Sequence, residues 1–181
     1  MNETLPLLRL AAERTSTLVR SLSDDQLALP TPCSEYDVKE LLNHLEWAMS
    51  GFESLAGGGG FPPPKEYTGD FPERAERALK AWDRPQAWEG TSEALHGLPM
   101  IMIAKMFLVD VVVHAWDLSK SVGRPFEVDD ETVAAILAFA EESAPMRKGS
   151  AAFGDPVEVP ADAPAFDRAV GLLGRDPAWT P

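Results

Sequence analysis

Apolar residues recur at helical spacing, three or four positions apart, over most of this chain. Residues at this spacing share one face of an α-helix, so the pattern predicts amphipathic helices. It predicts a helix reaching about residue 55, with an apolar face made of Val38, Leu41, Leu42, Leu45, Ala48, Met49 and Phe52. Further helices are predicted over about residues 5–22, 72–82, 99–122, 129–142 and 164–173.

Turn-forming residues separate these segments. Ser34 is predicted to cap the second helix, with Asp37 three positions later in a box-like arrangement. The glycine- and proline-rich residues 57–70 predict a mobile or extended connector, or a lid. A loop or short hairpin is predicted from Phe153 to Val159, and residues 88–98 receive no assignment.

The longest apolar run, Leu98 to Ala115, predicts the buried central helix of a bundle rather than a membrane span. It contains Lys105, Asp110 and His114 and is marginal in length for a bilayer. At 181 residues the chain fits one domain, residues 1–181, which can bury a sizeable core. The predicted fold class is therefore all-α.

Asp110 and His114 lie four positions apart in the most apolar part of this helix and share a face, with Asp117 about one turn further on. A carboxylate among valines is costly to bury without a partner. Lys105 points roughly 140° around the helix from Asp110 and is poorly placed to pair with it. Two interpretations follow: a buried ion pair in which the carboxylate orients the imidazole, or half of a metal site.

The two other histidines differ in their surroundings. His44 lies at the edge of its helix's apolar face and can meet a neighbouring helix, whereas His96 lies in a turn, where a histidine is usually solvated. His44, Asp110 and His114 therefore form the candidate metal site. Asp110 is predicted to be a ligand and not only an orienter of His114, because the surrounding valines offer it no hydrogen-bond donor.

The charge of the chain excludes some partners. A formal net charge of -13 repels phosphate backbones and anionic lipids, so neither nucleic acid nor a membrane surface is an expected partner. One cysteine cannot form an internal disulfide, and the N-terminus lacks the pattern of a secretory signal, so we expect a cytoplasmic protein. Apolar helices on the bundle surface leave a homodimer open.

Three groups of segments carry a resemblance to a known family. They are residues 31–38 with Leu41-Leu42-Asn43-His44-Leu45, residues 110–118, and the tail segments 153–160 and 174–179. Together they resemble the actinobacterial branch of the DinB-like superfamily, and more narrowly the metal-binding domain of mycothiol-dependent maleylpyruvate isomerase. The resemblance implies a four-helix DinB-like bundle, with short extra helices here, that holds one divalent metal. Zinc is the usual metal and nickel is an alternative, and His44, Asp110 and His114 match the ligand set.

The chain departs from the isomerase in two ways. The isomerase has a glutamate where this chain has Asp110, and it carries a second, C-terminal domain for which this chain has no room. These differences argue against maleylpyruvate isomerisation as the reaction, but not against metal binding.

Other residues near the candidate ligands have more than one interpretation. Asp117 shares a face with His114, and Glu40 shares one with His44. Each acid is a candidate to accept a hydrogen bond from the ring N–H of its histidine. Glu40 is also typical of a solvated acid. Cys33 fits a small buried residue better than a reactive thiolate. The remaining candidates, expected to be core, pocket wall or surface, are Trp47, Trp116 and Arg124.

Three ligands would leave one coordination position of a zinc ion open, as in catalytic sites. The leading hypothesis is an enzyme that uses the metal and a mycothiol-like thiol for S-transfer to, or isomerisation of, a small electrophile. The alternatives are a non-catalytic metal-binding sensor or interaction module, and a bundle with a buried Asp–His pair and no metal.

Overall fold

The computed structural model describes residues 3–147 and 154–181 and is mostly helical, which confirms the all-α prediction. In the described part of the chain the helices are α1 (Thr4–Arg20), α2 (Val38–Ala56), α3 (Phe71–Trp82), α4 (Met100–Ser121), α5 (Asp130–Arg147) and α6 (Ala165–Leu172). Two short strands, β1 (Thr91–Ser92) and β2 (Leu98–Pro99), pair antiparallel, with Thr91 opposite Pro99. Short 3-10 turns cover Asp24–Gln26, Pro85–Trp88 and Glu93–Leu95.

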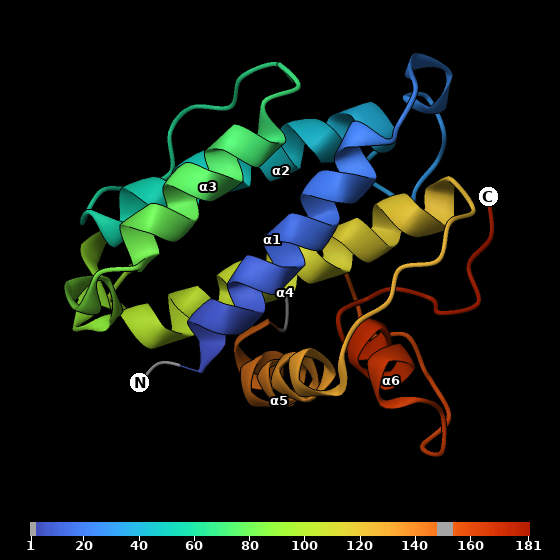
Figure 1. Ribbon diagram of the computed structural model, residues 1–181. Helices are drawn as coiled ribbons and strands as arrows, with labels where there is room; N and C mark the ends of the chain where they lie inside the picture. The colour runs from blue at the N-terminus through green and yellow to red at the C-terminus, as the bar shows by residue number, and fades with distance from the viewer. Residues whose placement is uncertain (1–2, 148–153) are drawn as a thin grey trace.

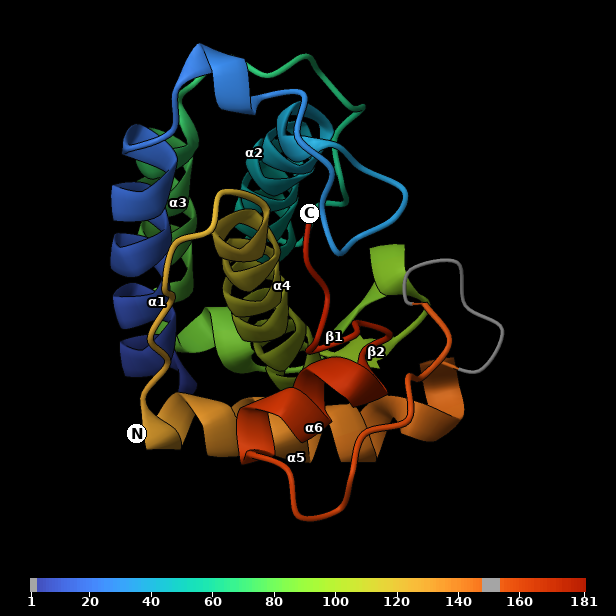
Figure 2. The same cartoon turned by 90° about the vertical axis from the view of Figure 1, so that its right-hand side faces the viewer.

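Helices α1 to α4 form a bundle in which α1 packs on α3 and α4, and α2 packs on α3 and α4. The connection from α1 to α2 crosses one end of this bundle, as Figure 2 shows. Helices α5 and α6 pack against each other and run across the bundle, with α5 against α4 (Figures 1 and 2). The bundle with additional helices is the predicted architecture.

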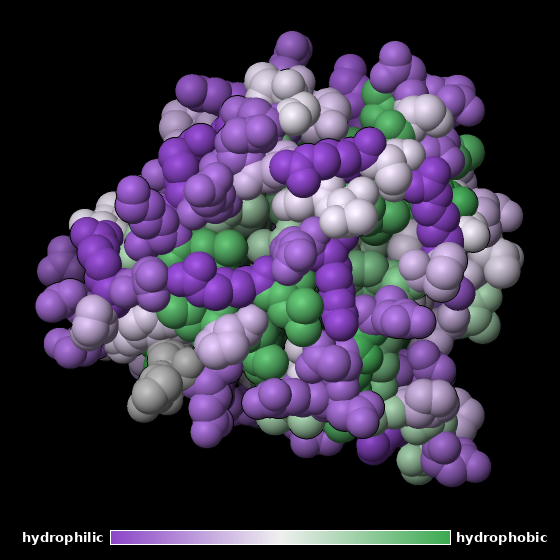
Figure 3. All heavy atoms as spheres, in the orientation of Figure 1, coloured by the Kyte–Doolittle hydropathy of each residue, from purple (hydrophilic) through white to green (hydrophobic). Residues whose placement is uncertain are grey.

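Helix α4 is the central element of the core. Its residues from Phe107 to Ser119 are buried, with the exception of Asp110, which is half-buried. Phe107 stacks on Phe52 of α2 with ring centroids 4.4 Å apart. No helix among residues 3–147 and 154–181 is both long and apolar enough to cross a membrane. Polar side chains cover most of the face in Figure 3, and apolar residues are visible mainly between them.

The start of α2 differs from the prediction. The helix begins at Val38 and its cap is Asp37, not Ser34. Asp37 accepts a hydrogen bond from the backbone N–H of Glu40 at 2.8 Å, and Glu40 accepts one from the N–H of Asp37 at 2.9 Å. The preceding residues are held in a closed loop by Thr31, whose hydroxyl contacts two carbonyl oxygens of that loop, and this loop excludes an earlier helix start.

Helix α5 is longer than predicted. It continues past Glu142 and past Pro145 to Arg147. Arg147 donates one hydrogen bond to the carbonyl oxygen of Ala140 in α5 and another to the carbonyl oxygen of Leu172 at the end of α6. These bonds tie the C-terminal end of α5 to its own preceding turn and to the end of α6.

For residues 153–159 the sequence predicted a loop or a short hairpin, and the described part of this segment is a loop. Phe153 lies outside the described residues, and residues 154–159 contain no strand. Instead the N–H of Val157 donates to the carbonyl oxygen of Gly171, so this segment packs along α6. The observed hairpin, β1–β2, runs from Thr91 to Pro99. It lies almost wholly within residues 88–98, for which the sequence pattern predicted neither helix nor strand.

Residues 57–70 form an extended connector that is attached to α2. Gly51 leaves room for Phe61, because a Cβ at this glycine would lie 2.0 Å from the Phe61 ring. Trp47 donates from Nε1 to the carbonyl oxygen of Pro62 at 2.6 Å. The far end is held by Glu46, a buried carboxylate that accepts hydrogen bonds from the backbone N–H groups of Thr68 and Asp70.

We predict that Glu46→Gln lowers the free energy of unfolding by about 2 kcal/mol or more, because buried hydrogen bonds to a charged acceptor are strong. Glu46 also lies 3.8 Å from the guanidinium of Arg74, whose charge would lose its buried partner. Urea denaturation measures the change. The matched control is Glu53→Gln, which breaks a largely exposed pair with Arg77 and should cost less than about 1 kcal/mol. Equal effects of the two variants would contradict this role for Glu46.

Candidate metal centre

Three side chains from two neighbouring helices converge at one point of the bundle. His44 comes from α2, and Asp110 and His114 come from α4. Asp110 Oδ1 lies 3.2 Å from His44 Nε2 and 3.7 Å from His114 Nε2. One ligand atom of each residue lies within 4.8 Å of the other two. This is the group of residues that the sequence pattern selected.

The environment of Asp110 suits a metal ligand. Its second oxygen, Oδ2, is buried and has no hydrogen-bond partner within the described residues. Lys105 of the same helix pairs with Glu142 of α5 at 2.6 Å and is therefore engaged elsewhere. A buried carboxylate oxygen without a donor is costly unless a cation compensates it. The donor set of two imidazoles and one carboxylate is a common one for zinc, and it fits these three residues.

The metal-free site favours an ion pair between its members. Burial lowers the pKa of His44, but the charge of Asp110 and its hydrogen bond outweigh this, so the pKa lies above its ordinary value. Burial likewise raises the pKa of Asp110, but the interaction with His44 and His114 outweighs it, so the pKa is lowered. Binding of a metal ion to His44 would therefore release a proton from its imidazole.

His114 is oriented by Asp117, the next acid along α4. Asp117 is fully buried, and its Oδ2 lies 2.9 Å from His114 Nδ1. A carboxylate there can accept a hydrogen bond from Nδ1–H, which places the lone pair on Nε2, 3.7 Å from Asp110 Oδ1. The same Asp117 oxygen accepts a hydrogen bond from Arg175 Nη2 at 3.2 Å. The sequence pattern placed Asp117 correctly on the His114 face but did not identify Arg175.

Aromatic rings and a loop cover the His44 side of the site. Tyr36 stacks on His44 with ring centroids 5.5 Å apart, and Trp47 lies 5.8 Å away on the same helix as His44. The side chains of His44 and Asp110 each remain 20% exposed, so the centre is in contact with solvent. The closed loop made by residues 30–37 brings Tyr36 to this position.

Cys33 on this loop belongs to a second group of possible ligands. Ligand atoms of Cys33, His114 and Asp117 also lie within 4.8 Å of one another. This group fits a metal less well, because the Asp117 oxygen that contacts His114 already accepts from the Arg175 guanidinium. Burial also raises the pKa of the Cys33 thiol and disfavours the thiolate that a metal needs.

The other residues considered from sequence lie elsewhere. Glu40 is exposed and forms the cap of α2 with Asp37, so its carboxylate has a partner other than His44. His96 is exposed in a left-handed turn with φ of 54°. Arg124 is exposed and contacts Ser21. Trp116 is buried and packs edge-on against Phe166 of α6.

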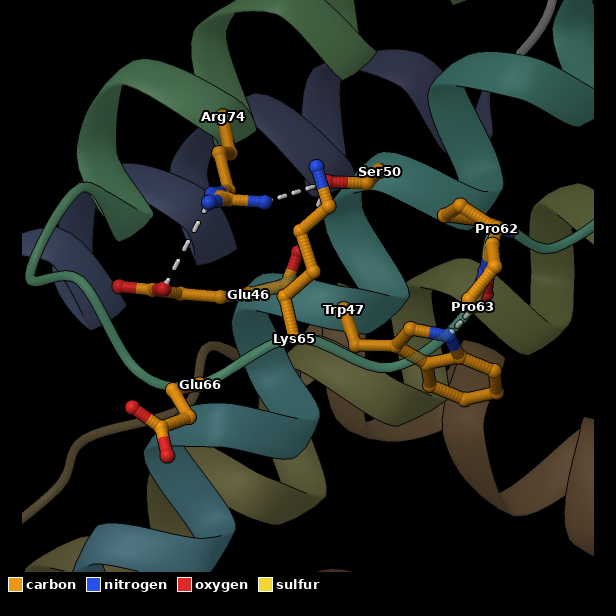
Figure 4. Close-up of a pocket in the computed structure, with 8 residues that line it drawn as sticks. All are labelled: Glu46, Trp47, Ser50, Pro62, Pro63, Lys65, Glu66 and Arg74. Carbon is orange, nitrogen blue, oxygen red and sulfur yellow. Dashed lines mark hydrogen bonds and ion pairs between the residues drawn. The ribbon is translucent and has the colours of Figure 1, made fainter.

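A pocket of about 90 Å³ lies one turn further along α2 (Figure 4). Trp47 of α2 and two prolines of the connector line one side of it, and Arg74 of α3 lies across from the prolines and donates to Ser50 of α2 at 2.9 Å. The Trp47 side chain borders this pocket and also contacts His44. Any ligand that reaches beyond His44 along α2 would therefore meet the connector.

Comparison with known proteins finds a family match for the N-terminal part of the chain. Residues 8–78 match the family described as the mycothiol maleylpyruvate isomerase N-terminal domain. The resemblance inferred from the sequence is thus confirmed for this segment. The matched segment of the chain contains His44, but Asp110 and His114 lie beyond it.

Two uncharacterised proteins of Mycobacterium tuberculosis, from strains CDC 1551 / Oshkosh and ATCC 25618 / H37Rv, are similar to nearly the whole chain. Each is 28% identical over 178 residues, which covers 91% of this chain and 93% of the relative. No solved structure matches the chain at a significant level.

The ion pair in the metal-free site leads to a prediction for His44. In the metal-free protein its pKa should lie above 6.5, and Asp110→Asn should lower it, because burial persists while the compensating charge is lost. Titration of the imidazole signals by NMR measures both values. Asp83→Asn, which removes an exposed acid at the end of α3, is the control and should leave His44 unchanged. An identical His44 titration in wild type and Asp110→Asn would refute the pairing.

Proposed function

We propose that this protein binds one divalent metal ion through His44, Asp110 and His114 and uses it in thiol-dependent chemistry on a small electrophile. The observation that carries the proposal is the convergence of His44, Asp110 and His114, one ligand atom of each lying within 4.8 Å of the other two. Asp110 Oδ2, for which the described part of the chain offers no hydrogen-bond partner, adds a second, independent argument for a cation. Zinc is the metal best suited to these ligands, with nickel as the alternative.

The thiol part of the proposal rests on the family. The matching family is named for a mycothiol-dependent isomerase, so a low-molecular-weight thiol resembling mycothiol is the proposed co-substrate. A divalent cation with an open position would favour the thiolate form of such a thiol. The chain itself contributes a wall of Tyr36 and Trp47 beside His44, which would orient the bound molecule and limit its contact with water.

We also propose a cytoplasmic location for this activity. The single cysteine, Cys33, is free, and thiols of this kind persist in a reducing compartment.

We predict that the wild-type protein, stripped of metal and without a histidine tag, binds close to one equivalent of zinc. His44→Ala and Asp110→Asn should each weaken the affinity by about ten-fold or more, because each removes a donor or its charge. Competition titration with a chelator of known affinity gives the constants. His96→Ala is the matched control, since His96 lies exposed in its turn, and it should bind zinc as the wild type does.

Three results would contradict the metal site in different ways. A wild-type protein that retains no zinc would exclude it altogether. Unchanged affinity in Asp110→Asn would remove Asp110 from the ligand set. Equal losses in His96→Ala and His44→Ala would show that the measured binding does not depend on this site.

The catalytic part is tested with mycothiol and a bimane halide, an electrophile that becomes fluorescent when a thiol sulfur displaces its halide. Zinc-loaded wild-type protein should accelerate this reaction well above the protein-free rate, and Asp110→Asn should lose the acceleration. His96→Ala should retain it. A zinc-loaded protein that gives no acceleration with mycothiol, glutathione or cysteine would instead indicate a non-catalytic metal-binding module.

A further inference from the structure

Arg175 is a buried cation placed against the second group of possible ligands. Only 7% of the residue is exposed. Its Nη2 donates to Asp117 Oδ2 at 3.2 Å, and its Nη1 donates to the carbonyl oxygen of Leu173 at 2.8 Å. Burial raises the pKa of the Cys33 thiol, and the positive charge of Arg175 acts against this shift.

The end of α6 places Arg175 in this position. Gly174 has φ of +84°, and a Cβ there would lie 2.8 Å from the backbone of Gly154, so both conformation and space require glycine. The N–H of Gly174 donates to Gly171 and that of Arg175 to Val170, which is the pattern of a Schellman cap. This cap turns the chain back toward α4, where Lys120 donates to the carbonyl oxygen of Pro177.

Without Arg175, the remaining groups have the composition of a metal site. Cys33, His114 and Asp117 would offer a sulfur, a nitrogen and an oxygen within 4.8 Å of one another. Asp117 Oδ1 is fully buried and has no hydrogen-bond partner among the described residues. A buried carboxylate needs a cation, and Arg175 now supplies that charge.

We propose that Arg175 is a specificity-determining residue that keeps the Cys33–His114–Asp117 group closed to metal ions. His114 is common to both groups, so a cation bound on the Cys33 side would compete for the same imidazole. The Asp117 oxygen beside His114 Nδ1 already accepts a hydrogen bond from Arg175, so a cation on the Cys33 side would have to displace the guanidinium, whereas His114 Nε2 lies 3.7 Å from Asp110 Oδ1 in the other group. This inference deepens the proposed function, because it explains which of two overlapping donor sets takes the metal.

The experiment adds cobalt(II) chloride to the metal-free, reduced protein and records the absorption spectrum. A cysteine sulfur bound to cobalt gives an intense charge-transfer band in the near ultraviolet, and binding releases the thiol proton to the buffer. Wild type should bind cobalt without this band. Arg175→Met should show it at close to the intensity of one sulfur per cobalt, because the metal ion replaces the lost charge beside Asp117.

Two variants control the measurement. Arg175→Lys keeps a cation at the site and should resemble the wild type, without the band. The double variant Arg175→Met with Cys33→Ser should lose the band, which assigns it to the only cysteine in the chain. Circular dichroism checks folding, and if Arg175→Met does not fold, Arg175→Gln takes its place with the same expected result.

The outcomes separate this inference from the proposed function. If the wild type binds cobalt and no neutral variant at position 175 shows the band, the role of Arg175 in excluding metal ions is overturned, while the proposed metal site is not affected. A sulfur band in the wild type overturns it directly. If the wild type binds no metal but Arg175→Met binds it through sulfur, the role of Arg175 in excluding metal ions is supported and the proposed function fails.

Discussion

A fully buried carboxylate, Asp117, is the constraint on which the rest of the centre depends. A charge with no exposed surface is unstable in a protein core unless neighbouring groups compensate it. Asp117 meets this requirement with two donors, His114 on its own helix and Arg175 from the end of the chain. One oxygen atom thereby orients an imidazole and anchors the C-terminal segment to the central helix.

The packing of α2 against α4 then makes the site. His44 and Asp110 are separated by 66 positions in the sequence, yet their side chains meet because the two helices are neighbours in the bundle. Both helices hold their positions through extensive apolar burial, with Leu41, Leu45 and Val111 fully buried. Side chains on such rigid elements hold their relative positions precisely, which favours metal coordination. The loop that precedes α2 adds Tyr36 and Cys33 to the same region.

Local patterns in the sequence predicted the helices and the Asp110–His114 pair, because helical periodicity and the four-residue spacing are local properties. His44 could be added because the chain has only three histidines. For Glu40 the local pattern left two interpretations open, because two local interactions compete for its carboxylate. Glu40 shares a face with His44, but it also lies three positions after Asp37, and the capping box takes its carboxylate.

Arg175 and Cys33 could not be placed by spacing, because their contacts with Asp117 and His114 depend on the path of a loop and of the C-terminal segment. The signal for Arg175 was its position directly after Gly174, where a helix-ending glycine turns the chain inward. The start of α2 was missed for a similar reason, since the hydrogen bonds of Thr31 that close the preceding loop are not visible in a helical pattern.

The most direct test of the metal centre is a crystal structure of the zinc-loaded protein with anomalous data collected on both sides of the zinc absorption edge. We expect one anomalous peak between α2 and α4, within about 2.0–2.2 Å of His44 Nε2, His114 Nε2 and an oxygen of Asp110. A peak beside Cys33 and Asp117, or no peak in a crystal that contains zinc, would contradict it.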